Sequence, residues 1–231
     1  MEDSGEQLAL SAESLAALQS FYAEKHQKQA EFDRFAKLAQ FNSQKTQDDQ
    51  EPLNPIEIIT EDWQLSQFWY DDKTTDFYVD LTRPHLQANS LILFISSPTA
   101  FLGFKKTFPN YQNVALMEID DRFSVYKDQF IKYDYLKPLN FPNAQNLKGK
   151  ASFILMDPPF LNEDCLTKFA ITTRFLSNPN TQTLLSTGIV MTSLAKKFGL
   201  HETNFEPTHR SRLSNKFKAF TNFQNDKLKW I

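Results

Sequence analysis

Apolar positions along the chain alternate between two spacings. Short, nearly continuous apolar runs are typical of strands buried inside a parallel sheet, and they occur at residues 91–95, 114–119, 130–135 and 152–156. A fifth strand is expected at residues 183–186 with Ile189 and Val190, and final strands at 202–205 and 216–223. Helical spacing separates the runs, at residues 74–86, 101–108, 163–176 and 193–198. The alternation predicts an α/β fold with a mostly parallel, doubly wound sheet.

The first quarter of the chain has a different pattern. Leu15, Leu18 and Phe21 recur at helical spacing and predict a helix over residues 11–38. Residues 40–55 are polar and contain two prolines near their end, which is typical of a flexible linker. We therefore expect an N-terminal helix and linker over residues 1–55 and a folded domain over 56–231.

A doubly wound sheet binds its ligands beyond the carboxyl ends of its strands. The segment Asp157-Pro158-Pro159-Phe160 stands at such an end, directly after an apolar run and before a predicted helix. An isolated Asp-Pro-Pro would more often be a surface turn, but this position favours a site.

The chemistry of these four residues suits the transfer of a methyl group to an amine nitrogen. The nitrogen must be held and must lose a proton, and Asp157 offers a carboxylate for both. Prolines have no N–H and a fixed φ, so they stiffen the turn and leave the Pro158 carbonyl free to accept from the same nitrogen. Phe160 supplies a flat apolar face that suits either a stacked base or the stem of a lysine.

Polar residues after the other strands are candidates for binding a nucleoside cofactor. An acidic residue that ends the second strand often holds ribose hydroxyls, which makes Glu118 the first candidate and Asp120 the second, although a solvated strand end is the alternative. Asp134, after the third strand, is placed to contact an adenine amino group. The loop after the first strand lacks the usual glycine-rich turn, and the hydroxyls and backbone N–H groups of Ser96 and Ser97 would have to replace it.

Several segments resemble the elongation factor 1-alpha lysine methyltransferases, a family once labelled as N6-adenine-specific DNA methyltransferases because of its Asp-Pro-Pro-Phe/Tyr motif. The most specific is Trp-Gln-Leu-Ser-Gln-Phe-Trp-Tyr within residues 61–70, and residues 15–24, 118–123, 130–135, 157–160 and 207–217 are also similar. The resemblance implies a Rossmann-like, seven-strand class I methyltransferase that uses S-adenosyl-L-methionine. It also implies a lysine of translation elongation factor 1-alpha as the acceptor, in the cytoplasm. Asp157 to Phe160 would then form the acceptor-amine motif, with Gln67, Trp69 and Tyr70 beside the cofactor and the acceptor channel.

Charge and composition narrow the alternatives. The net charge is −3, whereas proteins that grip duplex DNA usually carry a basic surplus. The single cysteine, Cys165, and four unclustered histidines give no pattern for a metal site. No signal sequence or membrane-length apolar segment is present, and we expect a cytoplasmic monomer that is not bound to a membrane.

Two other functions remain open at this stage. One is N6-adenine methylation of DNA or RNA, because the same tetrapeptide suits a flipped-out base. The other is a catalytically inactive subunit that stabilises a partner, against which the intact Asp157–Phe160 motif argues. The basic stretch at residues 210–218 fits a solvated strand pair, with docking onto an acidic partner or nucleic acid as its alternative.

Overall fold

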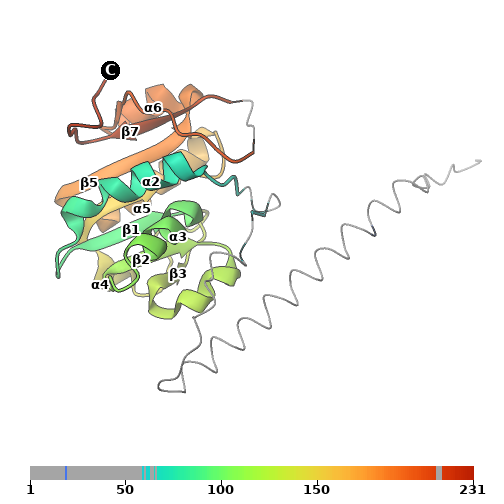
Figure 1. Cartoon of the computed structure of the whole chain (residues 1–231), viewed down its shortest axis with the longest axis vertical. Coiled ribbons are helices and arrows are strands. Elements are labelled where there is room, and N and C mark those ends of the chain that lie inside the picture. The colour runs from blue at the N-terminus through green and yellow to red at the C-terminus, as the bar shows by residue number, and fades with distance from the viewer. Residues whose placement is uncertain (1–18, 20–58, 60, 63–64, 66, 212–214) are drawn as a thin grey trace, which may run out of the picture. The chain divides into compact units, whose positions relative to one another are not determined.

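The chain divides into two units, Met1–Thr60 and Glu61–Ile231. The computed structural model describes residues 19, 59, 61–62, 65, 67–211 and 215–231. The predicted linker at 40–55 lies outside the described residues, as does the predicted helix at 11–38 apart from Gln19. The elements of the second unit are coloured in Figure 1.

Seven strands form one sheet, in the order β3-β2-β1-β4-β5-β7-β6. Their bounds are β1 Leu91–Ile95, β2 Val114–Glu118, β3 Phe130–Lys132, β4 Ala151–Met156, β5 Ser177–Gly188, β6 His201–Glu202 and β7 Phe217–Thr221. The pairs among β1 to β5 are parallel, and β7 runs antiparallel to both β5 and β6. This order, with an antiparallel β7 beside β5, is that of the class I methyltransferase fold, so the predicted fold class is confirmed.

The helical segments connect these strands. Their bounds are α2 Asp72–Leu81, η3 Arg83–His85, α3 Pro98–Thr107, η4 Asp121–Gln129, α4 Ala144–Leu147, α5 Glu163–Leu176, η5 Ile189–Met191 and α6 Thr192–Lys197. In Figure 1, α2 and α3 cross in front of the strands. None of the helices in the described part of the chain is long and apolar enough to cross a membrane.

Both faces of the sheet are covered, which explains why its strands read as continuous apolar runs. Successive side chains of a strand point to opposite faces. On β1, Leu93 and Ile95 belong to the core cluster that includes Phe169 of α5. Phe94, on the other face, packs against Phe101 of α3 with ring centroids 6.0 Å apart. A strand buried on both faces shows no polar alternation.

Several predicted boundaries were wrong for local reasons. The helix expected at 74–86 runs over Asp72–Leu81 because Asp71 caps it, accepting from the Thr74 N–H at 2.8 Å. The helix expected from Phe101 begins at Pro98, a residue well suited to a first helical turn. Ile189 and Val190, predicted to continue the fifth strand, lie in the short η5 helix. The third strand ends at Lys132, and the strand expected at 202–205 spans only His201–Glu202.

Candidate active site

The four-residue motif is held between two regular elements. The buried strand β4 leads into Asp157, whose N–H donates to the Ile95 carbonyl of β1 at 3.0 Å. On the other side, Asn162 caps α5 by accepting from the Cys165 N–H at 2.9 Å. Pro158 is buried, Pro159 is half-buried, and the Phe160 ring is 43% exposed. The motif therefore offers one carboxylate and one exposed aromatic face at the carboxyl edge of the sheet.

Tyr70 fixes one oxygen of that carboxylate. Its hydroxyl donates to Asp157 Oδ2 at 2.5 Å, and its side chain is fully enclosed. The ring stands edge-on to Tyr78, with centroids 5.2 Å apart, and lies 5.1 Å from the His209 ring. Among the described residues no hydrogen bond reaches Asp157 Oδ1. One carboxylate oxygen is thus immobilised, and the other is uncommitted.

Two segments far apart in sequence meet behind Tyr70. Residues 70 and 209 form an antiparallel β-bridge, and the Arg210 N–H donates to the Trp69 carbonyl at 2.8 Å. The Asp71 N–H donates to the Thr208 carbonyl at 3.1 Å. These backbone bonds position the Tyr70 hydroxyl relative to Asp157.

Two carboxyls of the site, the half-buried Asp157 and the buried Glu118, have unusual titration properties. Burial raises the pKa of Asp157 to about 7; the Tyr70 hydrogen bond opposes that rise and the nearby Glu118 carboxylate adds to it. Burial likewise raises the pKa of Glu118 to about 7, against the backbone N–H donors of Ile119 and Asp120. Burial also lifts the pKa of Tyr70 well above its usual value, so its phenol stays protonated as a donor. Groups that titrate near neutral pH are suited to proton transfer.

Glu118 and Asp120, the two candidates for the ribose contact, differ in how far their oxygens are occupied. Asp120 pairs with Arg122 at 2.6 Å and accepts from Gln67 Nε2 at 3.0 Å, so both of its oxygens are engaged. Glu118 ends β2, and its Oε1 accepts from the backbone N–H of Ile119 at 2.9 Å. Its Oε2 accepts no hydrogen bond from the described residues. The geometry therefore favours Glu118 over Asp120 as a ligand-binding carboxylate.

The loop after β1 replaces a glycine turn with serines. Ser96 has a φ of 50°, in the left-handed region that glycine usually occupies. Ser97 is buried, and its hydroxyl has no hydrogen-bond partner in the described part of the chain. Buried polar atoms are nearly always hydrogen-bonded. The Ser97 hydroxyl and Glu118 Oε2, at the adjoining ends of β1 and β2, therefore fit the polar groups of S-adenosylmethionine.

The other predicted cofactor residues lie at different places in the structure. Gln67 reaches the end of β2 through Asp120, whereas Tyr70 reaches Asp157. The Arg210 guanidinium lies over the buried Trp69 ring, with Cζ 5.7 Å from the ring centroid. Asp134 is half-buried, and its Oδ1 accepts from the Leu136 N–H at 2.9 Å.

Sequence analysis assigned no role in the site to two contributors, Tyr135 and His209. The Tyr135 ring lies 6.0 Å from Phe160 and widens the aromatic face beside the motif. Its position next to Asp134, after a strand, was a usable signal. His209 packs on Tyr70 from a segment 139 positions later in the chain, and no local pattern indicates that contact.

Comparisons with known proteins identify the family of the chain. Residues 61–225 match the family described as probable N6-adenine methyltransferase. The chain is 36% identical to the protein-lysine N-methyltransferase M142.8 of Caenorhabditis elegans, over 97% of this chain and 98% of that protein. It is 34% identical to EFM5 of Saccharomyces cerevisiae, also a protein-lysine N-methyltransferase (93% and 92% covered), and to EEF1A lysine methyltransferase 1 of Gallus gallus (93% of each).

A solved structure supports the fold alone. A branched-chain polyamine synthase from Thermus thermophilus is 11% identical and superposes with a TM-score of 0.50, over 72% of this chain and 60% of that one. Sequence identity over nearly the full length carries more information. The chain belongs to the family of S-adenosylmethionine-dependent protein-lysine N-methyltransferases that these relatives represent.

Proposed function

We propose that the protein methylates the side-chain amine of a lysine on translation elongation factor 1-alpha, acting as a monomer in the cytoplasm. The observation that carries the chemistry is the Asp157 carboxylate, which has one oxygen held by Tyr70 and the other uncommitted. The choice of acceptor is supported by relatives from chicken, mouse and human that are named EEF1A lysine methyltransferase 1, at 31–34% identity.

In this proposal Asp157 prepares the lysine for attack. A lysine side chain is protonated at neutral pH, and its nitrogen has no free lone pair until that proton leaves. The Asp157 carboxylate takes the proton through Oδ1 while Tyr70 keeps the carboxyl group in place. The pKa of about 7 suits this exchange, because a general base works best when its pKa is near the working pH. The freed lone pair could then attack the methyl carbon of bound S-adenosylmethionine, so that the N–C bond would form as the S–C bond breaks and S-adenosylhomocysteine leaves.

The aromatic residues guide the amine. Phe160 and Tyr135 present neighbouring rings beside Asp157. An aromatic face accommodates the methylene stem of lysine and attracts its cationic head. The Pro158 carbonyl acts as the second acceptor for the nitrogen.

The cofactor supplies an electrophilic methyl group on a sulfonium. We assign Glu118 to its ribose hydroxyls, the Ser96–Ser97 loop to its polar tail and Asp134 to its adenine. Gln67 and Asp120 act behind Glu118, through the hydrogen bond that joins them. Trp69, enclosed beneath Arg210, shapes the wall of the site.

The second candidate is methylation of adenine N6, favoured by the description of the matching family. The test is incubation of the full chain with labelled S-adenosylmethionine and either purified elongation factor 1-alpha or adenine-containing DNA and RNA oligonucleotides. We expect label on the protein, at a lysine located by mass spectrometry. Label on oligonucleotides with none on the protein would overturn the proposal.

A further inference from the structure

Four exposed apolar side chains follow the ends of strands that meet at the site. Leu136 is 56% exposed, Phe160 43%, Ile189 41% and Val190 71%. We call these four residues the apolar rim. They come from the segments after β3, β4 and β5. Single exposed apolar residues are ordinary, whereas a group around a functional site usually marks an interaction surface.

Contacts between their neighbours connect these segments. Tyr135, which precedes Leu136, lies with its ring 6.0 Å from the Phe160 ring. Leu161, which follows Phe160, packs so closely on Gly188 that a Cβ there would stand 2.8 Å from Leu161 Cδ1. These contacts bring together the three segments that carry the rim, after β3, β4 and β5.

The rim is also held in place. The Ile189 N–H donates to the Lys216 carbonyl at 2.9 Å, and the Thr192 hydroxyl donates to the Ile189 carbonyl at 2.7 Å. These bonds fix the backbone that carries Val190. A fixed apolar surface loses little conformational entropy when a partner covers it.

We infer that the apolar rim docks an apolar patch of the folded substrate protein, next to the lysine that enters the site. This inference rests on the proposed function. A lysine nitrogen lies only about 6 Å from its own Cα, so an amine that reaches Asp157 brings the surface around it over the rim. A substrate surface with an exposed aliphatic or aromatic residue beside its lysine would cover Val190 and Leu136. An isolated base has no such flanking surface.

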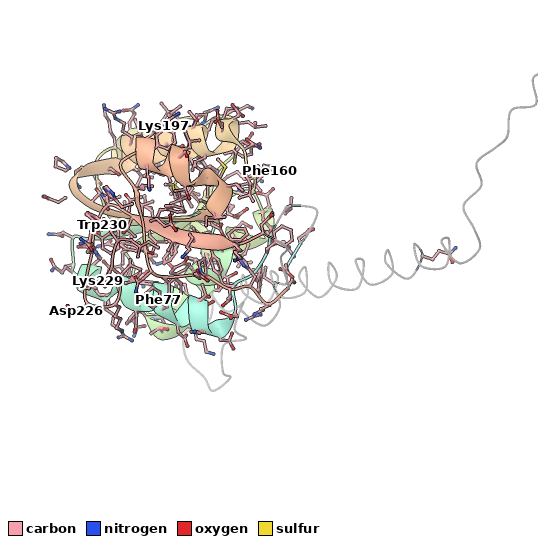
Figure 2. All side chains as sticks on the ribbon, turned by 90° about the horizontal axis from the view of Figure 1, so that it is seen from above. Phe77, Phe160, Lys197, Asp226, Lys229 and Trp230 are labelled. Atoms are coloured by element: carbon pink, nitrogen blue, oxygen red, sulfur yellow. The ribbon has the colours of Figure 1, made fainter. Side chains whose placement is uncertain are left out.

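The test replaces rim residues outside the catalytic motif, in Val190→Asp and Leu136→Asp. The matched control is Ile231→Asp, because Ile231 is 69% exposed, close to the 71% of Val190. Ile231 follows Trp230, which Figure 2 shows on the opposite side of the domain from Phe160. Steady-state methylation of purified elongation factor 1-alpha gives KM and kcat, and calorimetry gives the affinity for S-adenosylmethionine.

We expect each rim variant to raise KM for the protein substrate at least about 10-fold, because a charge would have to be buried against an apolar patch. We expect kcat and cofactor affinity within about 3-fold of wild type, and the Ile231→Asp control to be unchanged in all three. Val190→Leu, which keeps the position apolar, should have the KM of wild type. Thermal unfolding identifies a variant that fails to fold. If one rim variant does not fold, the KM of the other rim variant tests the inference.

Two failures are distinguishable. An active wild type whose KM is unaffected by either rim variant overturns the docking inference and leaves the proposed function standing. A wild type that methylates no lysine of the elongation factor overturns the proposed function, and the docking inference with it.

Discussion

The Tyr70 hydroxyl donates to Asp157 Oδ2 across 2.5 Å, joining residues 87 positions apart. The bond links the segment before α2 to the turn after β4. It also stabilises the ionised form of a carboxyl whose pKa is raised by burial. Tyr70 is therefore a positioning residue in the proposed mechanism, not a group that contacts the reacting atoms.

Tyr70→Phe should lower methyl transfer about 10-fold or more at neutral pH, because Asp157 loses its orienting donor. The bond favours the carboxylate, so its loss raises the pKa of Asp157 above about 7. Since the ionised form is the one that accepts the proton, the acidic limb of the kcat/KM profile should move to higher pH. The check is that profile for both proteins.

Tyr111→Phe is the matched control, since the Tyr111 hydroxyl donates to the Ser90 carbonyl at 2.5 Å and faces neither Asp157 nor Glu118. Its profile should coincide with that of wild type. Equal profiles for Tyr70→Phe and wild type would show that the Tyr70 hydroxyl has no part in the reaction.

Asp157→Asn should separate chemistry from cofactor binding. The amide keeps the shape of the side chain and can still accept from Tyr70, but it cannot take a proton. We expect kcat to fall by roughly 10²-fold or more, as when other preorganised catalytic groups are removed. Affinity for S-adenosylmethionine, measured by calorimetry, should stay within about 3-fold. A kcat within a few-fold of wild type would refute the role of Asp157 as the base.

Sequence reasoning predicted where the Asp157–Phe160 motif lies in the sheet, because that position depends on the order of residues close together in the chain. Asp157 directly follows a strand that is apolar on both faces, and strand ends are where this fold places its sites. The same reasoning placed Glu118 at the end of β2. It ranked Glu118 ahead of Asp120 by position alone, and it could not predict that Arg122 and Gln67 fill the Asp120 oxygens.

Local sequence patterns could not predict contacts between distant segments. The Tyr70–His209 bridge joins residues 139 positions apart and has no periodic signal. The error at Ile189 and Val190 has a similar cause. Both residues read as strand because they are apolar and β-branched. They are nevertheless exposed, and they lie in η5, beyond the end of β5.

Ser96 should carry backbone strain that a glycine would relieve. Its φ of 50° costs an ordinary residue roughly 1–2 kcal/mol, while glycine gives back about 0.5–1 kcal/mol in chain entropy. Ser96→Gly should therefore raise the free energy of unfolding by up to about 1 kcal/mol, and the β-branched Ser96→Val should lower it. Urea denaturation of the three proteins gives the order, and a Val variant as stable as Gly would contradict it.

Glu118→Gln should weaken cofactor binding and should reduce the loss of stability that wild type shows as pH rises. The pKa of Glu118 is about 7 in the folded protein and near 4.5 in an exposed chain. A raised carboxyl pKa means that the unfolded chain loses this proton first as pH rises. Wild type therefore loses stability between about pH 4.5 and pH 7, by roughly 3 kcal/mol for this group, and the loss persists above pH 7.

Glutamine cannot ionise, and its carbonyl oxygen can still accept from the N–H of Ile119. The fall in unfolding free energy between pH 5 and pH 8 should thus be smaller in the variant, as measured by urea denaturation at both values. Glu163→Gln, an exposed change at the start of α5, is the control and should keep the wild-type fall. Added S-adenosylmethionine should stabilise wild type much more than the Glu118→Gln protein, because a ligand stabilises the native state in proportion to the logarithm of its affinity, and losing the ribose contact weakens that affinity. An equal cofactor-induced increase in both would remove Glu118 from the ribose, whatever its effect on the pH dependence.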